Sequence, residues 1–127
     1  LAEKIIEALQ LGSLRGRDLG IDGKHISGGE KRLINIARIF FHAERYDYLI
    51  FDEIFTSIDV LTKRRIFPLL KDLIKNKSCI IVSHDIEEIE FFCDHVVSIE
   101  ADGKIFSGTY EEAKINKSFL SKILAEN

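Results

Sequence analysis

The sequence predicts an α/β domain in which a mainly parallel sheet is flanked by helices and followed by a C-terminal β-hairpin. Two short apolar runs, residues 48–51 and 79–82, have the length and composition of strands buried in a parallel sheet. Residues 60–76 lie between them and repeat apolar side chains at helical spacing. The order strand, helix, strand, helix, hairpin is typical of the α/β class.

Length, composition and charge favour one globular domain in a reducing cytoplasm. The chain has 127 residues, of which 46% are hydrophobic, and this suffices for a single core. Its 18 basic and 21 acidic residues give a net charge of −3, so no nucleic-acid partner is expected. No apolar run approaches the roughly 20 residues that cross a bilayer, and the first residues do not resemble a secretion signal. Cys79 and Cys93 lie in or beside apolar runs and are expected to be buried thiols.

The first 45 residues predict two helices joined by a loop. Apolar residues with helical spacing open the chain: Ala2, Ile5, Ile6 and Leu9. They predict the tail of a helix that began upstream and ends at Gly12. Four glycines among residues 12–26 predict the loop. Ser27 and Glu30 have the spacing of a capping box and predict the start of the second helix.

The second half of the chain predicts the sheet and its remaining helices. The helix over residues 60–76 contains the only proline, Pro68, which is expected to kink it unless tertiary contacts offset the cost of an interior proline. The chain then closes with two strands, the turn between them and two short helices: strands 96–99 and 104–107, turn 101–103, and helices that begin at Thr109 and Ser118.

Two carboxylates, Asp52 and Glu53, follow the first apolar run directly. In open α/β sheets the carboxyl ends of the strands form the edge where ligands bind. In phosphate-transfer ATPases an aspartate at this place holds magnesium, and a neighbouring carboxylate orients and deprotonates the attacking water. Taken alone, the pair is explained better by a simple loop cap.

Two further signals point to phosphate chemistry. Ser27, Gly28 and Gly29 open a helix, where backbone N–H groups converge at the positive end of the helix dipole and glycines allow an anion to approach. His84 ends the second apolar run, and a neutral imidazole there can donate to a phosphate oxygen. Each signal alone also fits a structural role, as a flexible capped turn or a histidine at a strand end.

Taken in order, these motifs resemble those of the ATP-binding cassette (ABC) ATPases over nearly the whole chain. The matching segments are the signature sequence with its continuation, the Walker B strand, the D-loop, the switch histidine and the closing hairpin and helix: residues 26–30, 36–38, 48–53, 56–59, 83–85, 93–97, 102–105 and 108–112. The resemblance implies the C-terminal half of a P-loop-NTPase-type nucleotide-binding domain. Residues 1–45 would be the end of a helical subdomain with the signature helix, and residues 46–127 the catalytic-core half.

The resemblance also implies a role for each site residue. The residues implied to contact ATP held by a partner domain, in the signature sequence and the D-loop, are Ser27, Gly28, Gly29, Glu30 and Asp59. Asp52 would serve Mg²⁺ through water, Glu53 would be the general base, and His84 would sense the γ-phosphate. The implied partners are a second nucleotide-binding domain, identical or different, and a membrane-spanning domain or subunit. The implied location is the cytoplasmic face of a membrane.

The chain departs from the family pattern at three places. Ile54 and Phe55 replace the small and hydroxylated residues that usually follow the glutamate, which puts the packing of that loop in question. The linker 42–47 is about two residues longer than usual. A P-loop requires Gly, four residues and then Gly-Lys-Ser/Thr, and neither Gly-Lys pair, at Gly23 or Gly103, has this form. The chain is therefore expected to be a fragment of a longer polypeptide, inactive alone.

The class of ABC protein stays open between several alternatives. The glycines at 20 and 23 before the signature sequence favour an exporter, whereas residues 83–85 suit an importer equally well. A soluble ABC ATPase of translation or DNA repair fits the acidic balance less well. A non-catalytic half-site is disfavoured because Ser27, Glu53 and His84 are all present.

Overall fold

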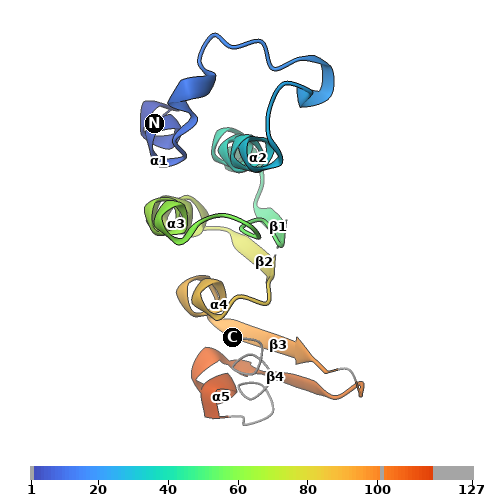
Figure 1. Cartoon of the computed structure of the whole chain (residues 1–127). Coiled ribbons are helices and arrows are strands. Elements are labelled where there is room, and N and C mark those ends of the chain that lie inside the picture. Colours follow the sequence, from blue (N-terminus) through green and yellow to red (C-terminus); the bar gives the residue numbers. More distant parts are fainter. Residues whose placement is uncertain (1, 101, 116–127) are drawn as a thin grey trace. The chain divides into compact units, whose positions relative to one another are not determined.

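The computed structural model describes residues 2–100 and 102–115, and the chain forms two compact units (Figure 1). The first unit is Leu1–Ile80 and the second is Ile81–Asn127. Each unit is described by itself below. Within the described ranges, no helix is both long and apolar enough to span a bilayer.

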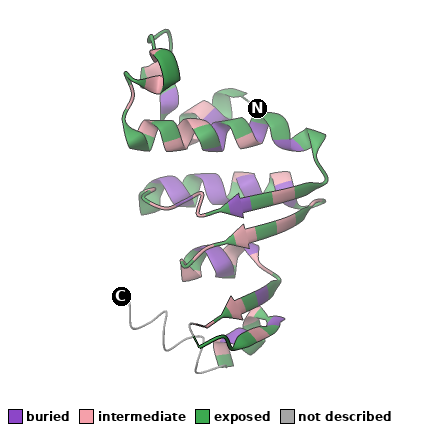
Figure 2. Cartoon of the chain, turned by 90° about the vertical axis from the view of Figure 1, so that its right-hand side faces the viewer, coloured by how far each residue is buried: buried purple, intermediate pink, exposed green. Residues whose placement is uncertain are grey.

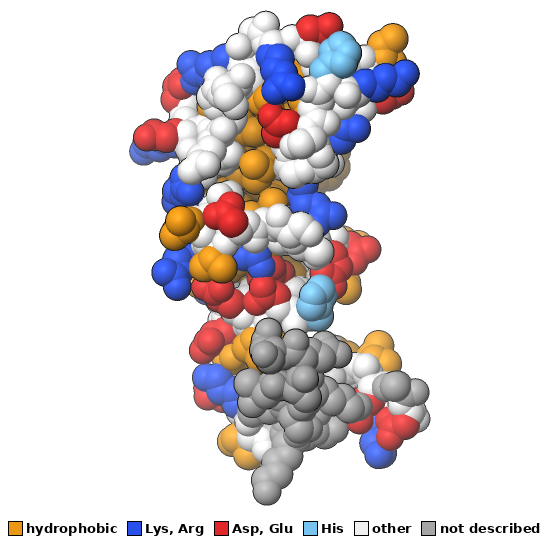
Figure 3. All heavy atoms as spheres, in the orientation of Figure 1, with side chains coloured by type: hydrophobic (Ala, Val, Ile, Leu, Met, Phe, Trp, Pro, Cys, Tyr) orange, Lys and Arg blue, Asp and Glu red, His pale blue; other side chains and the backbone are white. Residues whose placement is uncertain are grey.

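The helices and strands of the first unit follow one another in the order that the sequence predicts. Along the chain its elements are α1 (Ala2–Ala8), the 3-10 turns η1 (Leu11–Leu14) and η2 (Ile21–Gly23), α2 (Gly28–His42), η3 (Ala43–Arg45), β1 (Tyr48–Asp52), α3 (Val60–Ile74) and β2 (Ser78–Val82). β2 extends across the boundary to the second unit. On the face of the first unit seen in Figure 3, basic and acidic side chains are interspersed.

The first helix ends earlier than the sequence predicts. α1 stops at Ala8, not at Gly12, because Gln10 adopts a left-handed conformation with φ 55°. The chain then continues into η1, and both Leu9 and Leu11 are buried. Apolar spacing alone continues through Leu9 and does not reveal this backbone reversal.

The predicted loop over residues 12–26 contains the two 3-10 turns rather than a single irregular stretch. Gly20 has φ 71°, and a β-carbon placed there would lie 3.0 Å from Nδ1 of the His25 ring. The Asp18 carboxylate accepts a hydrogen bond from the Gly20 amide at 2.9 Å. Glycine is therefore favoured at this position, because other residues rarely adopt this φ and a β-carbon would crowd the His25 ring.

The core of the first unit lies between its helices. Figure 2 shows that buried residues gather along the helices, while the strands are mostly exposed or intermediate. α1 contacts both α2 and α3. The fully buried large side chains of the unit are Ile5, Leu9, Ile36, Phe55, Ile66 and Leu70. Phe55 packs on Phe67 of α3 with ring centroids 5.0 Å apart, so the residue that departs from the family pattern is a core residue.

The strands β1 and β2 pair and run in the same direction, as predicted, but they are not buried on both faces (Figure 2). Tyr48 and Ile50 are 78% and 72% exposed, whereas Phe51 is buried. In β2, Ile80 and Val82 are also exposed. The prediction of two fully buried strands is wrong for this chain, because one face of the pair is exposed to solvent.

Helix α3 is continuous through Pro68. It ends at Ile74, two residues before the predicted end. Pro68 is exposed, whereas Phe67 and Leu70 on either side of it are buried and pack α3 against the core. Packing of these neighbours offsets the cost of about 3 kcal/mol that an interior proline imposes on a helix.

The second unit is an antiparallel strand pair packed with two short helices. Its elements after β2 are α4 (Ile86–Phe92), β3 (His95–Ile99), β4 (Ile105–Thr109) and α5 (Tyr110–Ile115). In the hairpin, Val97 pairs with Ser107 and Ile99 with Ile105. The two strands begin and end within two residues of their predicted limits. The predicted helix from Ser118, and Ala101 of the turn, lie outside the described residues.

The core of the second unit is small. Ile89, Val96 and Ala113 are its buried apolar centre, and Phe106 and Tyr110 pack partly buried against it.

Both cysteines are thiols and are half-buried, whereas the sequence predicted buried thiols. Cys93 packs at the core of the second unit, and Cys79 lies in β2. Burial raises the pKa of the Cys79 thiol, which favours its protonated form.

Candidate functional site

The turn Ser27–Gly28–Gly29, called the signature turn here, begins helix α2 with the predicted capping box. The Glu30 amide donates to Ser27 Oγ at 3.1 Å, and the Ser27 amide donates to Glu30 Oε2 at 2.7 Å. Two of the otherwise unpaired amides at the helix start are thereby satisfied. The signature turn is exposed, so its backbone faces solvent at the positive end of a 15-residue helix.

The glycines of the signature turn are not needed for packing in the described part of the chain. A β-carbon on Gly28 would meet no other atom within 4 Å, and one on Gly29 would approach only Ser27 Oγ, at 4.0 Å. Neither residue has a positive φ. Their lack of side chains therefore leaves open space above the helix start, which suits the close approach of an external group.

Glu30 is held by its own helix start. Besides the Ser27 amide, its carboxylate accepts a hydrogen bond from Arg17 at 3.3 Å. The hydrogen bond from the Ser27 backbone is the main reason that the pKa of Glu30 is lowered. The structure thus gives Glu30 a capping role, and any contact with a nucleotide would be additional to it.

Asp52 and Glu53 lie where strand β1 ends. Asp52 is its last residue and is exposed, while Glu53 is half-buried and has φ 50°. The Thr56 hydroxyl donates to Glu53 Oε2 at 2.6 Å. Arg32 of α2 donates a hydrogen bond to the backbone carbonyl of Thr56. The sequence did not predict the contacts of Arg32 and Thr56, which join α2 to the loop that follows β1.

Asp59 closes the same loop as the N-cap of α3. Its carboxylate accepts a hydrogen bond from the Thr62 amide at 2.9 Å. Hydrogen bonding with Thr62 lowers the pKa of Asp59. The first unit therefore contains the signature turn, the Asp52–Glu53 pair and Asp59, each beside a helix or strand end.

His84 belongs to the second unit and is exposed just after β2. Its neighbours are fixed by the start of α4. The Ser83 hydroxyl donates to the buried Glu88 carboxylate at 2.6 Å, and Asp85 caps α4 by accepting from the Glu87 amide at 2.9 Å. These contacts hold the backbone on both sides of His84.

The described residues contain no group of three or more His, Cys, Asp or Glu side chains arranged to hold a metal ion. A single exposed carboxylate, Asp52, fits Mg²⁺ nevertheless, because this ion usually keeps several waters and binds one or two carboxylates beside substrate phosphates.

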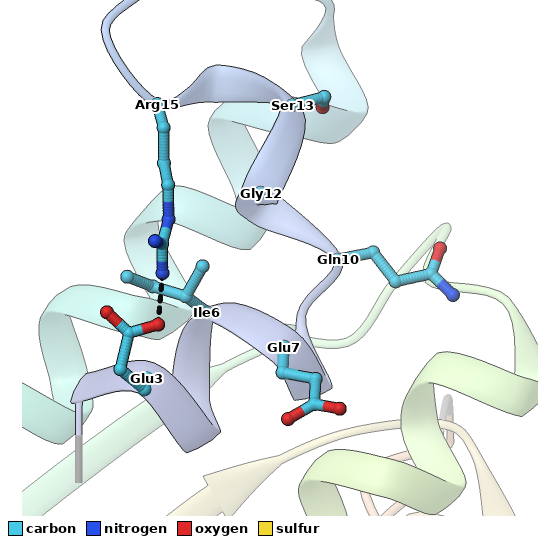
Figure 4. Close-up of a pocket in the computed structure, with 7 residues that line it drawn as sticks. All are labelled: Glu3, Ile6, Glu7, Gln10, Gly12, Ser13 and Arg15. Atoms are coloured by element: carbon cyan, nitrogen blue, oxygen red, sulfur yellow. Dashed lines mark hydrogen bonds and ion pairs between the residues drawn. The ribbon is translucent and has the colours of Figure 1, made fainter.

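A pocket in the first unit lies away from these residues. Its walls come from α1 and the residues around η1, and Figure 4 shows Arg15 reaching down to Glu3, to which it donates a hydrogen bond. Both side chains are largely exposed, so this ion pair adds little stability. None of the predicted site residues lines this pocket.

No protein-family model matches the chain. Comparison with curated proteins finds relatives that include ABC transporters. The chain is 32% identical over 119 residues to ABC transporter C family member 6 of Dictyostelium discoideum and 37% identical over 100 residues to the chelated iron transport system membrane protein YfeB of Yersinia pestis. It is 31% identical over 104 residues to the high-affinity zinc uptake system ATP-binding protein ZnuC of Bacillus subtilis. These matches cover 87%, 78% and 80% of the chain.

The chain spans only part of these relatives, namely 9%, 32% and 42% of their lengths. Among solved structures, a bacterial Atm1-family ABC exporter with ATP bound aligns with 98% of the chain and 23% of its own, at a TM-score of 0.77 and 17% identity. A structure that describes ATP-driven dimerization and DNA-stimulated activation of SMC ATPases aligns with 81% of this chain. The alignment covers 62% of the SMC chain, at a TM-score of 0.59 and 26% identity. The fold is therefore that of part of an ABC nucleotide-binding domain.

Proposed function

We propose, from the premise that this chain belongs to the ATP-binding cassette family of ATPases, that it supplies one half of an ATP-hydrolysing site. In the first unit the half-site consists of the signature turn, the Asp52–Glu53 pair and Asp59. The family resemblance implies a further role for His84 of the second unit. Other protein segments complete it with the P-loop that cradles the β- and γ-phosphates, because the 127 residues contain no P-loop sequence.

In this proposal the signature turn binds the γ-phosphate of ATP that a second nucleotide-binding domain holds. The amides of Gly28 and Gly29 donate to phosphate oxygens, and the helix dipole of α2 adds favourable electrostatic interaction. The open space above these glycines is the observation that carries the proposal, because packing in the first unit does not require glycine at either position. Asp59 would lie at the contact between the two domains.

Glu53 would act as the general base for the attacking water, and Asp52 would hold Mg²⁺ through water. Bound Mg²⁺ neutralises charge on the phosphates during transfer. Glu53 is half-buried and accepts a hydrogen bond from Thr56, so its carboxylate is held in place beside the exposed Asp52. His84 would donate to the γ-phosphate and report its presence.

We propose further that the ATPase drives transmembrane transport, and that the transport is export. The chain would then work at the cytoplasmic face of a membrane, beside a membrane-spanning domain or subunit. Support for export comes from the spacing of Gly20 and Gly23 and from the alignment with the exporter structure. Relatives named for uptake make an importer the second candidate. The alignment with SMC ATPases keeps a soluble DNA-repair class as a third.

Ser27→Arg tests the assignment of the signature turn. In the assembled protein that contains this chain, we expect the substitution to abolish ATP-induced association of the two nucleotide-binding domains, because bulk and charge would displace the phosphate contacts. ATP affinity at the separate P-loop is expected to stay within twofold. Light scattering of a hydrolysis-deficient background measures the association directly.

Two controls accompany Ser27→Arg. Ser13→Arg adds the same side chain at another exposed serine of the first unit and is expected to leave association unchanged. Ser27→Ala removes the same cap without adding bulk. If the two Ser27 variants have equal circular dichroism, the loss of association in Ser27→Arg comes from blocked contacts and not from fraying of α2. ATP-induced association that survives Ser27→Arg would remove the signature turn from the site.

A further inference from the structure

The loop between β1 and α3, residues 53–59, is fixed at Thr56 by two contacts in opposite directions. The Thr56 hydroxyl donates to Glu53 Oε2 at 2.6 Å, within the loop. The Thr56 carbonyl accepts from the guanidinium of Arg32, which lies 24 residues earlier on α2. Thr56 therefore contacts both the Glu53 carboxylate and the helix that begins with the signature turn.

The backbone of this loop is strained and held from within. Glu53 and Ser57 have φ values of 50° and 64°, in the left-handed region that non-glycine residues rarely occupy. The Thr56 amide donates to the Glu53 carbonyl at 3.2 Å, and the Ile58 amide donates to the Phe55 carbonyl at 3.0 Å. Strained residues of this kind persist only where surrounding contacts over-determine them, and they cluster at functional sites.

The side chains of the loop are anchored on both sides of Thr56. Phe55 is fully buried and packs against Phe67 of α3. Asp59 caps the first turn of α3. With its neighbours fixed in this way, Thr56 has little freedom to turn, and its hydroxyl stays within reach of Glu53.

We propose that Thr56 is a positioning residue for Glu53, and that Arg32 holds Thr56 in the conformation required for this task. The inference rests on the proposed role of Glu53 as the general base. A hydrogen bond to one carboxylate oxygen restricts rotation of the carboxylate and fixes the direction in which it meets the attacking water. Because Arg32 lies five residues after Ser27 on α2, the same contact joins the loop that carries the base to the helix that begins with the signature turn.

The test compares Thr56→Val with Thr56→Ser in the assembled ATPase that contains this chain. Valine keeps the branched shape but has no hydroxyl, so kcat is expected to fall at least about tenfold while KM for ATP stays within twofold. Serine restores the hydroxyl, and its kcat is expected within about threefold of the parent protein. A structural role of Thr56 without the hydrogen bond would not separate these two variants.

A second comparison tests Arg32. Arg32→Gln is expected to lower kcat at least about fivefold, whereas Lys31→Gln, at the exposed neighbouring cation on α2, is expected to leave it unchanged. In the 127-residue chain itself, amide hydrogen exchange across residues 53–59 is expected to be faster in Arg32→Gln than in Lys31→Gln. This readout needs no activity.

Three results would overturn the inference: kcat of Thr56→Val within twofold of the parent protein, equal losses in Thr56→Val and Thr56→Ser, or equal exchange in the Arg32 and Lys31 variants. Glu53→Gln, measured in the same preparation, separates this failure from that of the proposed function. If Glu53→Gln is inactive and Thr56→Val is normal, only the positioning inference is lost. If Glu53→Gln keeps its turnover, the base assignment itself fails.

Discussion

Glu53→Gln is expected to lower the ATP turnover of the assembled protein by about a hundredfold or more, since general base catalysis contributes roughly 10² to 10⁴. The amide keeps the size of the side chain and still accepts a hydrogen bond from Thr56, but it cannot take a proton from water. Nucleotide binding is expected to be unchanged. Steady-state phosphate release and ATP affinity, measured on the same preparation, check both parts of this expectation.

A matched carboxylate change separates loss of the base from loss of charge. Glu44 is exposed in η3, away from the end of β1, and Glu44→Gln is expected to leave turnover unchanged. Turnover of Glu53→Gln within a few-fold of the parent protein would show that another group takes the proton.

Phe55→Ala is expected to lower the free energy of unfolding of the chain by about 3 to 5 kcal/mol, the usual cost of removing a buried phenylalanine ring. Phe55 is 0% exposed and packs on Phe67 in the core of the first unit. The ring also anchors the loop that carries Glu53 and Thr56. Urea unfolding followed by circular dichroism measures the loss.

The control for the core assignment is Phe41→Ala. Phe41 lies on α2 but is 47% exposed, so its truncation is expected to cost less than about 1 kcal/mol. Equal destabilisation by the two substitutions would mean that Phe55 does not anchor the loop in the core. The pair thus tests how the unusual Ile54–Phe55 dipeptide is accommodated.

Local patterns predicted much of the fold. The three-residue spacing of Ser27 and Glu30 predicted the start of α2, because a capping box is a contact between near neighbours in sequence. The apolar runs located β1 and β2 within one residue at each end. Alignment with the exporter structure confirms the predicted α/β fold. The curated ABC relatives confirm the assignment to part of an ABC domain.

Features that depend on tertiary contacts were not predictable in the same way. The exposure of Tyr48 and Ile50 depends on what packs on each face of the β1–β2 pair, and an apolar run does not encode this. The contact between Arg32 and Thr56 joins residues 24 positions apart. The left-handed Gln10 that ends α1 has no marker such as glycine. The chemical roles of Ser27, Asp52, Glu53, Asp59 and His84 remain predictions.

The measurement that tests the half-site most directly is isothermal titration of the 127-residue chain with Mg-ATP. The proposal predicts no binding in the micromolar range, because the amides and lysine of a P-loop hold the phosphates and this chain contributes neither. Adding a protein segment that contains a Walker A sequence is predicted to restore binding. Micromolar binding of Mg-ATP to the chain alone would contradict the account, since it would require a complete nucleotide site within these residues.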